Sequence, residues 1–534
     1  MASVEKVGIS PVASYRRSLF DLAGISATAS LIWFSFPGGD APWLAWLALV
    51  PLGLILHGRS AREAFALTTS AWLSVWLLTT WWLVPGLVEI TGMRINVVLA
   101  LYFFFCLFQA LAYGVVGVIY SRLGWSIGRY GAFKAAVLWT AAGALMPQIL
   151  PGNIAHSQYL YPRVIQVADL GGQSLLLFIM YWFAFLLVTG VMRWWATEQS
   201  NSVAKPLLLA SLLPVLLLVY GGWRMDQIQM QDRSPDRPRL KVGWVQGHLS
   251  ANRRSRRQWE LVAGEMVAAT EALIKARPGL DVIIWPEIPP PISYSHYPHD
   301  RQLLDALLDR HGVPLLIAAF NSPPEQATAS DAGYYNVAEF VTPAGLAGVY
   351  TKRRLLPFAE YLPGEDIWPG LRQLFPGALH YLPGKASQVF NLNGQVGLIP
   401  MICYEAFFPW IAKEGIALGG NVLINQADDV WFESPRGEQT QLALSMFRAV
   451  EYRIPLIRVA NSGLSAVVSA AGVITAGPNE LAFQSATVVP SHTHSVYYSL
   501  TGVLPWLIGG LGLLCLFGNR LGAGMGRLVV WWRS

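Results

Sequence analysis

Cys403 is the first residue in this sequence whose type and setting suit covalent chemistry. It ends the strand-like run Val396–Cys403, and a turn follows it. The other two cysteines, Cys106 and Cys515, lie within long apolar stretches, where cysteine usually acts as a small hydrophobic residue. A nucleophile at a strand-to-turn junction would be exposed at the rim of a sheet. Considered alone, Cys403 could equally be a buried structural cysteine.

Two charged residues stand in similar places. Glu287 follows the strand-like run Asp281–Trp285 and comes directly after Pro286, whose missing backbone N–H should end the strand. Its carboxylate could serve as a general base. Lys352 lies in the stretch Tyr350–Glu360 and begins a basic cluster, and a strand-end lysine near a thiol can lower the thiol pKa and stabilise an oxyanion. Considered singly, Glu287 could be a solvated loop residue and Lys352 an ordinary surface base.

Together, these three residues would supply a base, a cation and a nucleophile. That combination is what covalent acyl transfer requires. Each residue taken singly could have an ordinary structural role. That three residues of this kind should occur together in one part of the chain by chance is a much rarer coincidence. The sequence therefore predicts an acyl-transfer site formed by Glu287, Lys352 and Cys403.

The composition places this site in a membrane protein. The chain has 534 residues, of which 54% are hydrophobic and 13% are charged, whereas a soluble domain carries about 25% charged residues. This excludes an ordinary soluble globule and a disordered chain. In a membrane protein the net charge of +6 is first a signal of topology and not of nucleic-acid binding. Three cysteines are too few for a disulfide framework.

Apolar stretches near the ~20 residues that cross a hydrocarbon core fill the first part of the chain and return once near its end. The expected spans are Leu19–Pro37, Trp43–His57, Phe65–Val88, Val97–Tyr120, Ala132–Leu150, Leu175–Val191, Leu207–Gly221 and Leu500–Phe517. If the N-terminus is cytoplasmic, most Lys and Arg of the short loops are cytoplasmic too, as the positive-inside rule requires. The segment between the last two spans then lies outside the cytoplasm.

These observations predict three regions. Residues 1–225 form a transmembrane domain of about seven helices, residues 226–496 an extracytoplasmic domain, and residues 497–534 a C-terminal transmembrane helix with a basic cytoplasmic tail. In the middle region, strand-like runs alternate with the helical patterns Gln258–Ala276, Arg301–Arg310 and Gln439–Glu451. Such alternation predicts a layered α/β domain. The expected strands are Lys241–Gln246, Asp281–Trp285, Pro314–Phe320, Val337–Val341, Val396–Cys403, Val422–Asn425, Leu456–Ala460 and Ser465–Ser469.

The order and contexts of Glu287, Lys352 and Cys403 resemble the catalytic triad of the carbon–nitrogen hydrolase, or nitrilase, superfamily. The flanking residues are similar, more narrowly, to the apolipoprotein N-acyltransferases. The resemblance covers nearly the whole chain, because that family also has about eight spans with a nitrilase domain before the last. The motifs that carry it are Trp285-Pro286-Glu287, Lys352–Glu360, Cys403-Tyr404-Glu405, Trp431-Phe432 and Arg448–Glu451.

The resemblance implies a polytopic α-helical membrane domain and an α/β nitrilase-like αββα sandwich, in the bacterial inner membrane with the catalytic domain in the periplasm. Cys403 would take an acyl chain from a phospholipid as a thioester and pass it to the N-terminal amino group of a diacylglyceryl-cysteine in an apolipoprotein. Glu287 would be the base and Lys352 would stabilise the oxyanion. The positions that match supporting or substrate-binding residues of the family are Glu360, Tyr404, Glu405 and Trp431.

We expect no cofactor, no metal and no nucleic-acid partner, and we expect a monomer that acts on a phospholipid donor and a diacylated apolipoprotein acceptor. Some residues near the triad depart from the family's usual ones: His248, Asp428, Thr440 and Ser462. A paralogue that acylates a different amine therefore stays open. So do a membrane-tethered amidase and a non-enzymatic scaffold. Seven spans before the domain favour a lipid-facing site over the amidase, and a scaffold has no use for an intact triad.

Overall fold

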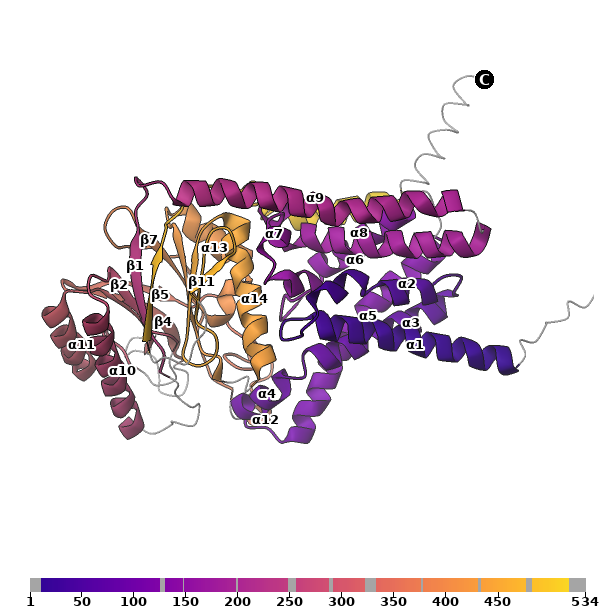
Figure 1. Cartoon of the computed structure of the whole chain (residues 1–534). Helices are drawn as coiled ribbons and strands as arrows, with labels where there is room; N and C mark the ends of the chain where they lie inside the picture. Colours follow the sequence, from indigo (N-terminus) through magenta and orange to yellow (C-terminus); the bar gives the residue numbers. More distant parts are fainter. Residues whose placement is uncertain are drawn as a thin grey trace, which may run out of the picture.

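Figure 1 shows the computed structural model of the chain, in which the N-terminal helices and a two-sheet domain lie side by side. The structure describes residues 11–124, 130–146, 148–197, 200–247, 256–287, 292–321, 333–375, 378–430, 434–476 and 483–517.

The N-terminal part of the structure is helical throughout. Its elements are α1 (Pro11–Ser35), η1 (Pro42–Leu47), α2 (Val50–Ile55), α3 (Ala61–Thr79), α4 (Leu83–Thr91), α5 (Ile95–Arg122), α6 (Gly131–Leu145), η2 (Ile154–Gln158), α7 (Pro162–Ile165), α8 (Ala168–Thr197) and α9 (Ser200–Asp232). After the sheets come α15 (Val496–Leu500) and an apolar helix, Leu504–Phe517. Each of the apolar stretches expected to span the membrane coincides with helix.

Within the described residues, four helices are long and apolar enough to cross a membrane: Arg16–Ser35, Ile95–Arg122, Ala168–Ala196 and Val203–Asp232. The pair α3 and α4, bent by 62°, makes a fifth if it is counted as one broken span. The shorter apolar helices are Pro42–Ile55, Gly131–Leu145 and Leu504–Phe517. By length and composition this is a multi-pass membrane protein.

Local sequence explains the bend between α3 and α4. The helix α3 begins at a capping box in which Ser60 and Glu63 satisfy each other's backbone N–H groups, a standard start signal. At its other end, the hydroxyls of Thr79 and Thr80 each donate to a carbonyl one turn back, at 2.7 Å. Bonding of a hydroxyl to the carbonyl one turn back often bends a helix, and it also satisfies the hydroxyl inside an apolar medium.

The rest of the chain forms two six-stranded sheets. The first has the order β12-β1-β2-β3-β4-β5 and the second β11-β10-β9-β8-β7-β6. Parallel pairing lies at the centre of each sheet, and antiparallel strands form the edges. The strands are β1 (Leu240–Val245), β2 (Val282–Ile284), β3 (Leu315–Asn321), β4 (Tyr335–Thr342), β5 (Gly345–Thr351), β6 (Phe390–Asn391), β7 (Gly397–Ile402), β8 (Val422–Ala427), β9 (Leu456–Ala460), β10 (Ala466–Val468), β11 (Ile474–Ala476) and β12 (Phe483–Val488).

The two sheets pack face to face through one apolar cluster that includes Trp244 and Ile284 of the first and Ile402 and Ile424 of the second. Helices α10 (Arg256–Ala276) and α11 (Pro298–His311) cover the outer face of the first sheet. Helices α13 (Pro409–Ala417) and α14 (Pro435–Tyr452) lie on the other side, toward the membrane helices (Figure 1). The architecture is an αββα sandwich, which confirms the predicted fold class.

The helix α14 belongs to both parts of the molecule. It packs against β9 and β10 on one side and against α8 on the other. Nearly all of its residues are buried, and the backbone N–H of Gln173 in α8 donates to Glu451 Oε1 at 3.0 Å. The outer helix layer of the sandwich is therefore also the layer that contacts the membrane helices.

Candidate active site

The three predicted catalytic residues lie at strand ends on the same side of the sandwich. In the first sheet, Glu287 follows β2 and Lys352 comes directly after β5. Cys403 comes directly after β7 of the second sheet and begins the short helix η3 (Cys403–Phe407). The charges of Glu287 and Lys352 both act on the Cys403 thiol. The site is thus assembled from both sheets.

Lys352 is clamped by two carboxylates. Its side chain is 1% exposed, and its Nζ lies 3.4 Å from Glu287 Oε1 and 2.5 Å from Glu360 Oε1. Each carboxylate is itself held: Asn336 Nδ2 donates to Glu287 Oε1 at 2.7 Å, and the backbone N–H of Leu356 donates to Glu360 Oε2 at 2.7 Å. The ammonium group therefore has a fixed position next to Glu287.

The electrostatics keep Lys352 charged. Burial alone would lower the pKa of the Lys352 ammonium, but the charges of Glu287 and Glu360 raise that pKa well above its usual value. Burial raises the pKa of Glu360, and Lys352 opposes that rise. A buried cation with carboxylate partners is suited to stabilise a developing negative charge without changing its own protonation state.

Cys403 has a strained backbone. Its φ is +50°, in the left-handed region that non-glycine residues seldom adopt and that is enriched at functional sites. Asn425 Nδ2 donates to the Cys403 carbonyl at 3.0 Å. Arg458 Nη1 in turn donates to Asn425 Oδ1 at 2.5 Å, and the same guanidinium forms a buried ion pair with Asp429 at 2.6 Å. This chain of contacts from β8 and β9 supports the turn that carries the thiol.

Glu405 connects the turn at Cys403 to the end of β5. It is fully buried and accepts hydrogen bonds from the backbone N–H groups of Ile402 at 2.8 Å, Arg353 at 2.7 Å and Arg354 at 3.1 Å. The Tyr350 hydroxyl also donates to it, at 2.9 Å. Glu405 thereby fixes the residues next to Cys403 relative to the residues next to Lys352.

The resting thiol is neutral. Burial raises the pKa of Cys403 well above its usual value, and the negative charge of Glu287 raises it further. Lys352 does lower the pKa of the thiol, as the sequence predicts, but burial outweighs it. A neutral thiol that acts as a nucleophile must give up its proton during attack, and a neighbouring carboxylate can accept that proton.

The structure places most of the other predicted residues near this site. The Tyr404 hydroxyl donates to the Ile149 carbonyl, and its ring packs edge-on against Phe408 at 4.8 Å. Asp428 follows β8 and accepts from Asn461 Nδ2 at 3.2 Å. Its pKa is raised well above its usual value by burial and by the charge of Glu287.

Thr440 is buried on α14, where its hydroxyl donates to the Arg436 carbonyl at 2.7 Å. Ser462 lies partly buried in the turn that follows β9. Trp431 and His248 lie outside the described residues.

Some residues that shape the site belong to none of the motifs recognised in the sequence. Asn336 lies inside β4, and Asn425 and Arg458 lie inside β8 and β9. All three are buried polar residues within strongly apolar strands. That pattern is the one available signal, because buried polar groups need partners and therefore mark networks. It does not reveal which residue each of them contacts.

An apolar cavity of about 380 Å³ joins Cys403 to the membrane helices. Its α5 wall includes Phe108, which is 61% exposed on the outer surface of the molecule. A chain in this cavity would therefore lie between the thiol and the surface that faces lipid. The lining residues are Leu83, Gly86, Leu87, Thr91, Met93, Val98, Leu101, Tyr102, Phe105, Phe108, Ile149, Leu150, Leu356, Pro357, Phe358, Ala359, Phe375, Cys403, Tyr404 and Gln441.

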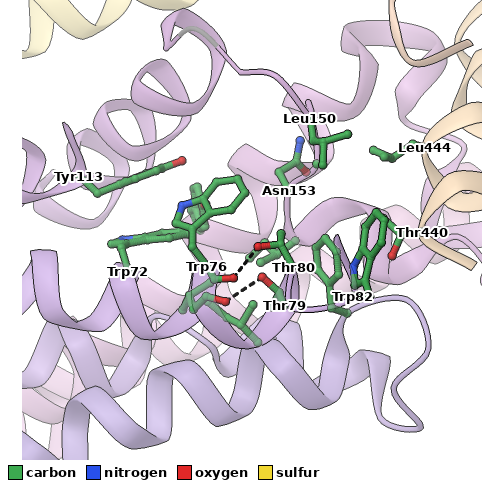
Figure 2. A pocket seen from close by; sticks show the side chains of 16 residues that line it. Trp72, Trp76, Thr79, Thr80, Trp82, Tyr113, Leu150, Asn153, Thr440 and Leu444 are labelled. Carbon is green, nitrogen blue, oxygen red and sulfur yellow. Dashed lines mark hydrogen bonds between the residues drawn. The ribbon is translucent and has the colours of Figure 1, made fainter. Parts of the chain in front are cut away.

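A second, much smaller pocket of about 40 Å³ lies deeper among the membrane helices. Figure 2 shows Trp72 and Trp76 toward one end of it, with Trp82 and the α14 residues Thr440 and Leu444 toward the other. Leu150 lines both this pocket and the larger cavity. The loop that contains Leu150 therefore separates the two spaces.

Comparisons with known proteins agree with this architecture. Residues 241–495 match the family model of carbon–nitrogen hydrolases, which assigns the sandwich to that superfamily. Residues 28–186 match the model of the apolipoprotein N-acyltransferase N-terminal domain. The chain belongs to the apolipoprotein N-acyltransferase family.

Similar curated proteins extend over most of the chain. The apolipoprotein N-acyltransferase of Geobacter metallireducens is 26% identical over 83% of this chain and 84% of its own length. The one from Brucella suis is 29% identical over 78% of this chain and 77% of its own. Among solved structures, Nit3 of Saccharomyces cerevisiae, a nitrilase-superfamily member, is 18% identical over 50% of this chain and 94% of its own, with a TM-score of 0.37.

Proposed function

We propose that this protein transfers an acyl chain from a membrane phospholipid to the N-terminal amino group of the diacylglyceryl-cysteine of an apolipoprotein, by way of a thioester on Cys403. The observation that carries the proposal is the apolar cavity between Cys403 and the membrane helices α4 and α5. A soluble amide or nitrile would not need a thiol that faces such a cavity. The names of the relatives support the same reaction.

In the first step, Cys403 attacks the carbonyl carbon of a phospholipid ester. The sulfur–carbon bond forms while the thiol proton passes to the Glu287 carboxylate, and the carbonyl oxygen becomes an oxyanion beside the Lys352 ammonium. The intermediate then collapses. The ester carbon–oxygen bond breaks, the glycerol oxygen takes the proton from Glu287, and a lysophospholipid leaves. The acyl chain remains as a thioester.

In the second step, the neutral amine of the acceptor attacks the thioester. The nitrogen–carbon bond forms, Glu287 takes a proton from the nitrogen, and Lys352 again faces the oxyanion. When the carbon–sulfur bond breaks, the sulfur regains the proton from Glu287. The product is an amide, and Cys403 is a thiol once more. Glu360 positions Lys352 in both steps, and Glu405 and Tyr404 support the turn that carries the nucleophile.

The proposal includes a cellular setting. The protein would lie in the bacterial inner membrane with residues 226–496 in the periplasm, where lipoprotein N-termini and the outer leaflet are accessible. Residues 1–225 and 497–534 would make up the membrane-embedded part. Trp431 would be a supporting or substrate-binding residue, and the enzyme would act as a monomer.

The test is direct labelling of the purified full-length protein. Incubation with a phospholipid that carries a labelled acyl chain should leave the label on Cys403 as a hydroxylamine-sensitive thioester, located by mass spectrometry. Cys403→Ala should carry no label, while the matched controls Cys106→Ala and Cys515→Ala should label normally. Addition of a diacylglyceryl-cysteine peptide should move the label to the peptide amine. Turnover of a small amide without any lipid adduct would instead make this a membrane-tethered amidase.

A further inference from the structure

Asp428 is a buried acid at the active-site end of the second sheet. It is 4% exposed and comes directly after β8. The strand β8 pairs in parallel with β7, and Gln426 lies opposite Ile402 in that pairing. Because neighbouring parallel strands end at the same edge of a sheet, Asp428 leaves the sheet beside Cys403.

The side chain of Asp428 belongs to the face of β8 that looks toward the first sheet. Side chains alternate between the two faces of a strand, and Ile424 lies in the apolar cluster between the sheets. Gln426, the next residue on that face, donates from Nε2 to the carbonyl of Trp285 in the first sheet at 2.7 Å. Glu287 and Asp428 each come two residues after this contact. The two carboxyl groups therefore lie near each other, and the charge of Glu287 acts on Asp428.

Each of these two carboxyl groups is held by only one of its oxygen atoms. Glu287 receives both of its hydrogen bonds at Oε1. Asp428 receives both at Oδ1, from the backbone N–H of Val430 and from Asn461 Nδ2, each at 3.2 Å. Within the residues that the structure describes, Glu287 Oε2 and Asp428 Oδ2 accept no hydrogen bond. Both acids thus keep one oxygen for a ligand that donates a proton or a hydrogen bond.

Negative charge predominates around Asp428. The charged and titratable groups on the surrounding elements are Glu287 after β2, Lys352 after β5, Glu360, Cys403 after β7, the adjacent Asp429, Glu438 of α14 and Arg458 of β9. Among these groups of the described structure, carboxyl groups outnumber cations. Burial and the charge of Glu287 raise the pKa of Asp428 well above its usual value. Its carboxylate is therefore a stronger base than an aspartate in water.

The second step of the proposed reaction has a use for such a base. Asp428 does not line the apolar cavity that would hold the acyl chain, so its position suits the acceptor better than the donor. An α-amino group has a usual pKa of about 7.7–8.0 and is mostly an ammonium group at neutral pH. An ammonium nitrogen has no lone pair for attack, so one proton must leave before the attack. Glu287 is needed for the other proton, which leaves the nitrogen during the attack.

We propose that Asp428 removes a proton from the ammonium group of the acceptor and so generates the neutral amine that attacks the thioester. The proton moves from the nitrogen to Asp428 Oδ2, and the electron pair of the broken N–H bond becomes the lone pair of the amine. The carboxylic acid returns its proton to solvent after the product leaves. The inference rests on the proposed function, because it concerns the second step of that reaction. Since this chain departs from the family's usual residue at Asp428, we assign the role to this chain alone.

The experiment starts from acyl-enzyme already formed on the full-length wild type and on Asp428→Asn. Asparagine keeps the Oδ1 acceptor that Val430 and Asn461 contact but cannot take up a proton, so a merely structural role survives the change. Transfer to two acceptors is followed in a single turnover between pH 6 and pH 9. One acceptor is a diacylglyceryl-cysteine peptide. The other is the same peptide with its amine replaced by an aminooxy group, which is neutral throughout this range.

The matched control is Asp309→Asn, at an exposed position of α11 on the outer face of the first sheet. About 2% of an ordinary α-amino group is neutral at pH 6, and most of it is neutral at pH 9. Asp428→Asn should therefore acylate the amine peptide about 10- to 50-fold more slowly than wild type at pH 6 and at nearly the wild-type rate at pH 9. With the aminooxy peptide the two proteins should agree at every pH. Asp309→Asn should match wild type with both acceptors.

A loss of the same size at every pH, or with both acceptors, would mean a structural role and would overturn the inference. So would the absence of any loss at pH 6, or failure of Asp428→Asn to form the acyl-enzyme in the first place. If the wild type formed no thioester from a phospholipid, or passed its acyl chain to neither peptide, the proposed function itself would fail.

Discussion

At the scale of single residues, burial shifts the pKa values of the thiol and of the lysine in opposite directions, and the charges nearby decide the protonation state of each. Burial raises the pKa of Cys403 and would lower that of Lys352. The charges of Glu287 and Glu360 outweigh burial at Lys352, so the lysine stays charged. At Cys403 the charge of Lys352 does not outweigh burial, so the pKa of the thiol stays raised. The site therefore holds a neutral thiol, which does not react with small oxidants or alkylating agents until a base removes its proton.

The first prediction concerns the pH dependence of this thiol. Alkylation of Cys403 by iodoacetamide should increase with pH and reach half of its limit above the usual thiol pKa. Lys352→Met should shift this profile to still higher pH, because Lys352 lowers the thiol pKa and its removal leaves the charges of Glu287 and Glu360 uncompensated. The rate is followed by mass spectrometry. Lys385→Met, at an exposed position of the same domain, should keep the wild-type profile.

The same Lys352→Met variant should form the acyl-enzyme about 100-fold or more slowly, as expected when one group that stabilises an oxyanion is lost. A profile that moved to lower pH, or acylation at a near-normal rate, would mean that another group faces the thiol and its oxyanion. Glu287→Gln should block acylation as well. Its alkylation profile should instead move to lower pH, because Glu287 raises the thiol pKa. The opposite shifts of the alkylation profile in the two variants thus distinguish the proposed base, Glu287, from the proposed oxyanion-stabilising residue, Lys352.

At the scale of elements, the site is a junction of strand ends, and Glu405 holds the junction together. One carboxylate at the start of η3 accepts three backbone N–H groups, two of them from the residues just after Lys352. It thereby joins the end of β7 in one sheet to the end of β5 in the other.

Glu405→Gln tests that connection. The amide NH2 would have to face a backbone N–H, whichever way it turns, so we expect a loss of about 2–3 kcal/mol in the free energy of unfolding. Thioester formation should fall at the same time. Thermal unfolding and acyl labelling measure the two effects. Glu414→Gln is the control: its carboxylate is 46% exposed and pairs with Arg353 on the surface, so it should cost less than about 1 kcal/mol.

The elements differ in how well the sequence predicts them. The central strands β1, β2, β3, β7, β8 and β9 are short apolar runs, and each was expected close to where it lies. The edge strands β5 and β12 were not, because their residues are partly exposed and mix glycine, serine and threonine with apolar residues. Each of these edge strands pairs with one neighbouring strand, and that pairing makes it a strand although its own sequence does not predict one.

The residues of the site also differ in how well the sequence predicts them. Glu287 and Cys403 are predicted as catalytic residues because each follows an apolar run with a reactive group, and Lys352 because it begins a basic cluster. Asn336 was not found, since a polar residue in a strand is ordinary until its surroundings are known. The cavity could not be predicted either. Its lining comes from residues 83–108, 149–150, 356–375, 403–404 and 441, and only the folded molecule brings these segments together.

At the scale of the whole molecule, the cavity exists only where the sandwich meets the membrane helices. A buried network next to that interface involves Asp169 at the start of α8. It pairs with Arg453, which follows α14, at 2.8 Å and with Arg224 of α9 at 2.7 Å, and it accepts from the Tyr220 hydroxyl at 2.6 Å. Arg453 also donates to Gln166 Oε1 at 2.7 Å. One carboxylate thus connects two membrane helices with the helix layer of the catalytic domain.

The last prediction is that Asp169→Asn loosens this connection. The change is nearly isosteric but leaves two guanidinium groups without their anion, one of them fully buried, and breaking such a pair usually costs about 3–5 kcal/mol. The midpoint of thermal unfolding should fall by roughly 5 °C or more, and acyl-enzyme formation should fall with it because the cavity loses a fixed wall. Asp232→Asn on α9, whose partner Arg237 is 3.6 Å away and partly exposed, should change neither. If Asp169→Asn unfolds at the wild-type temperature and acylates Cys403 at the wild-type rate, the two parts are held together by apolar packing of α14 against α8 alone.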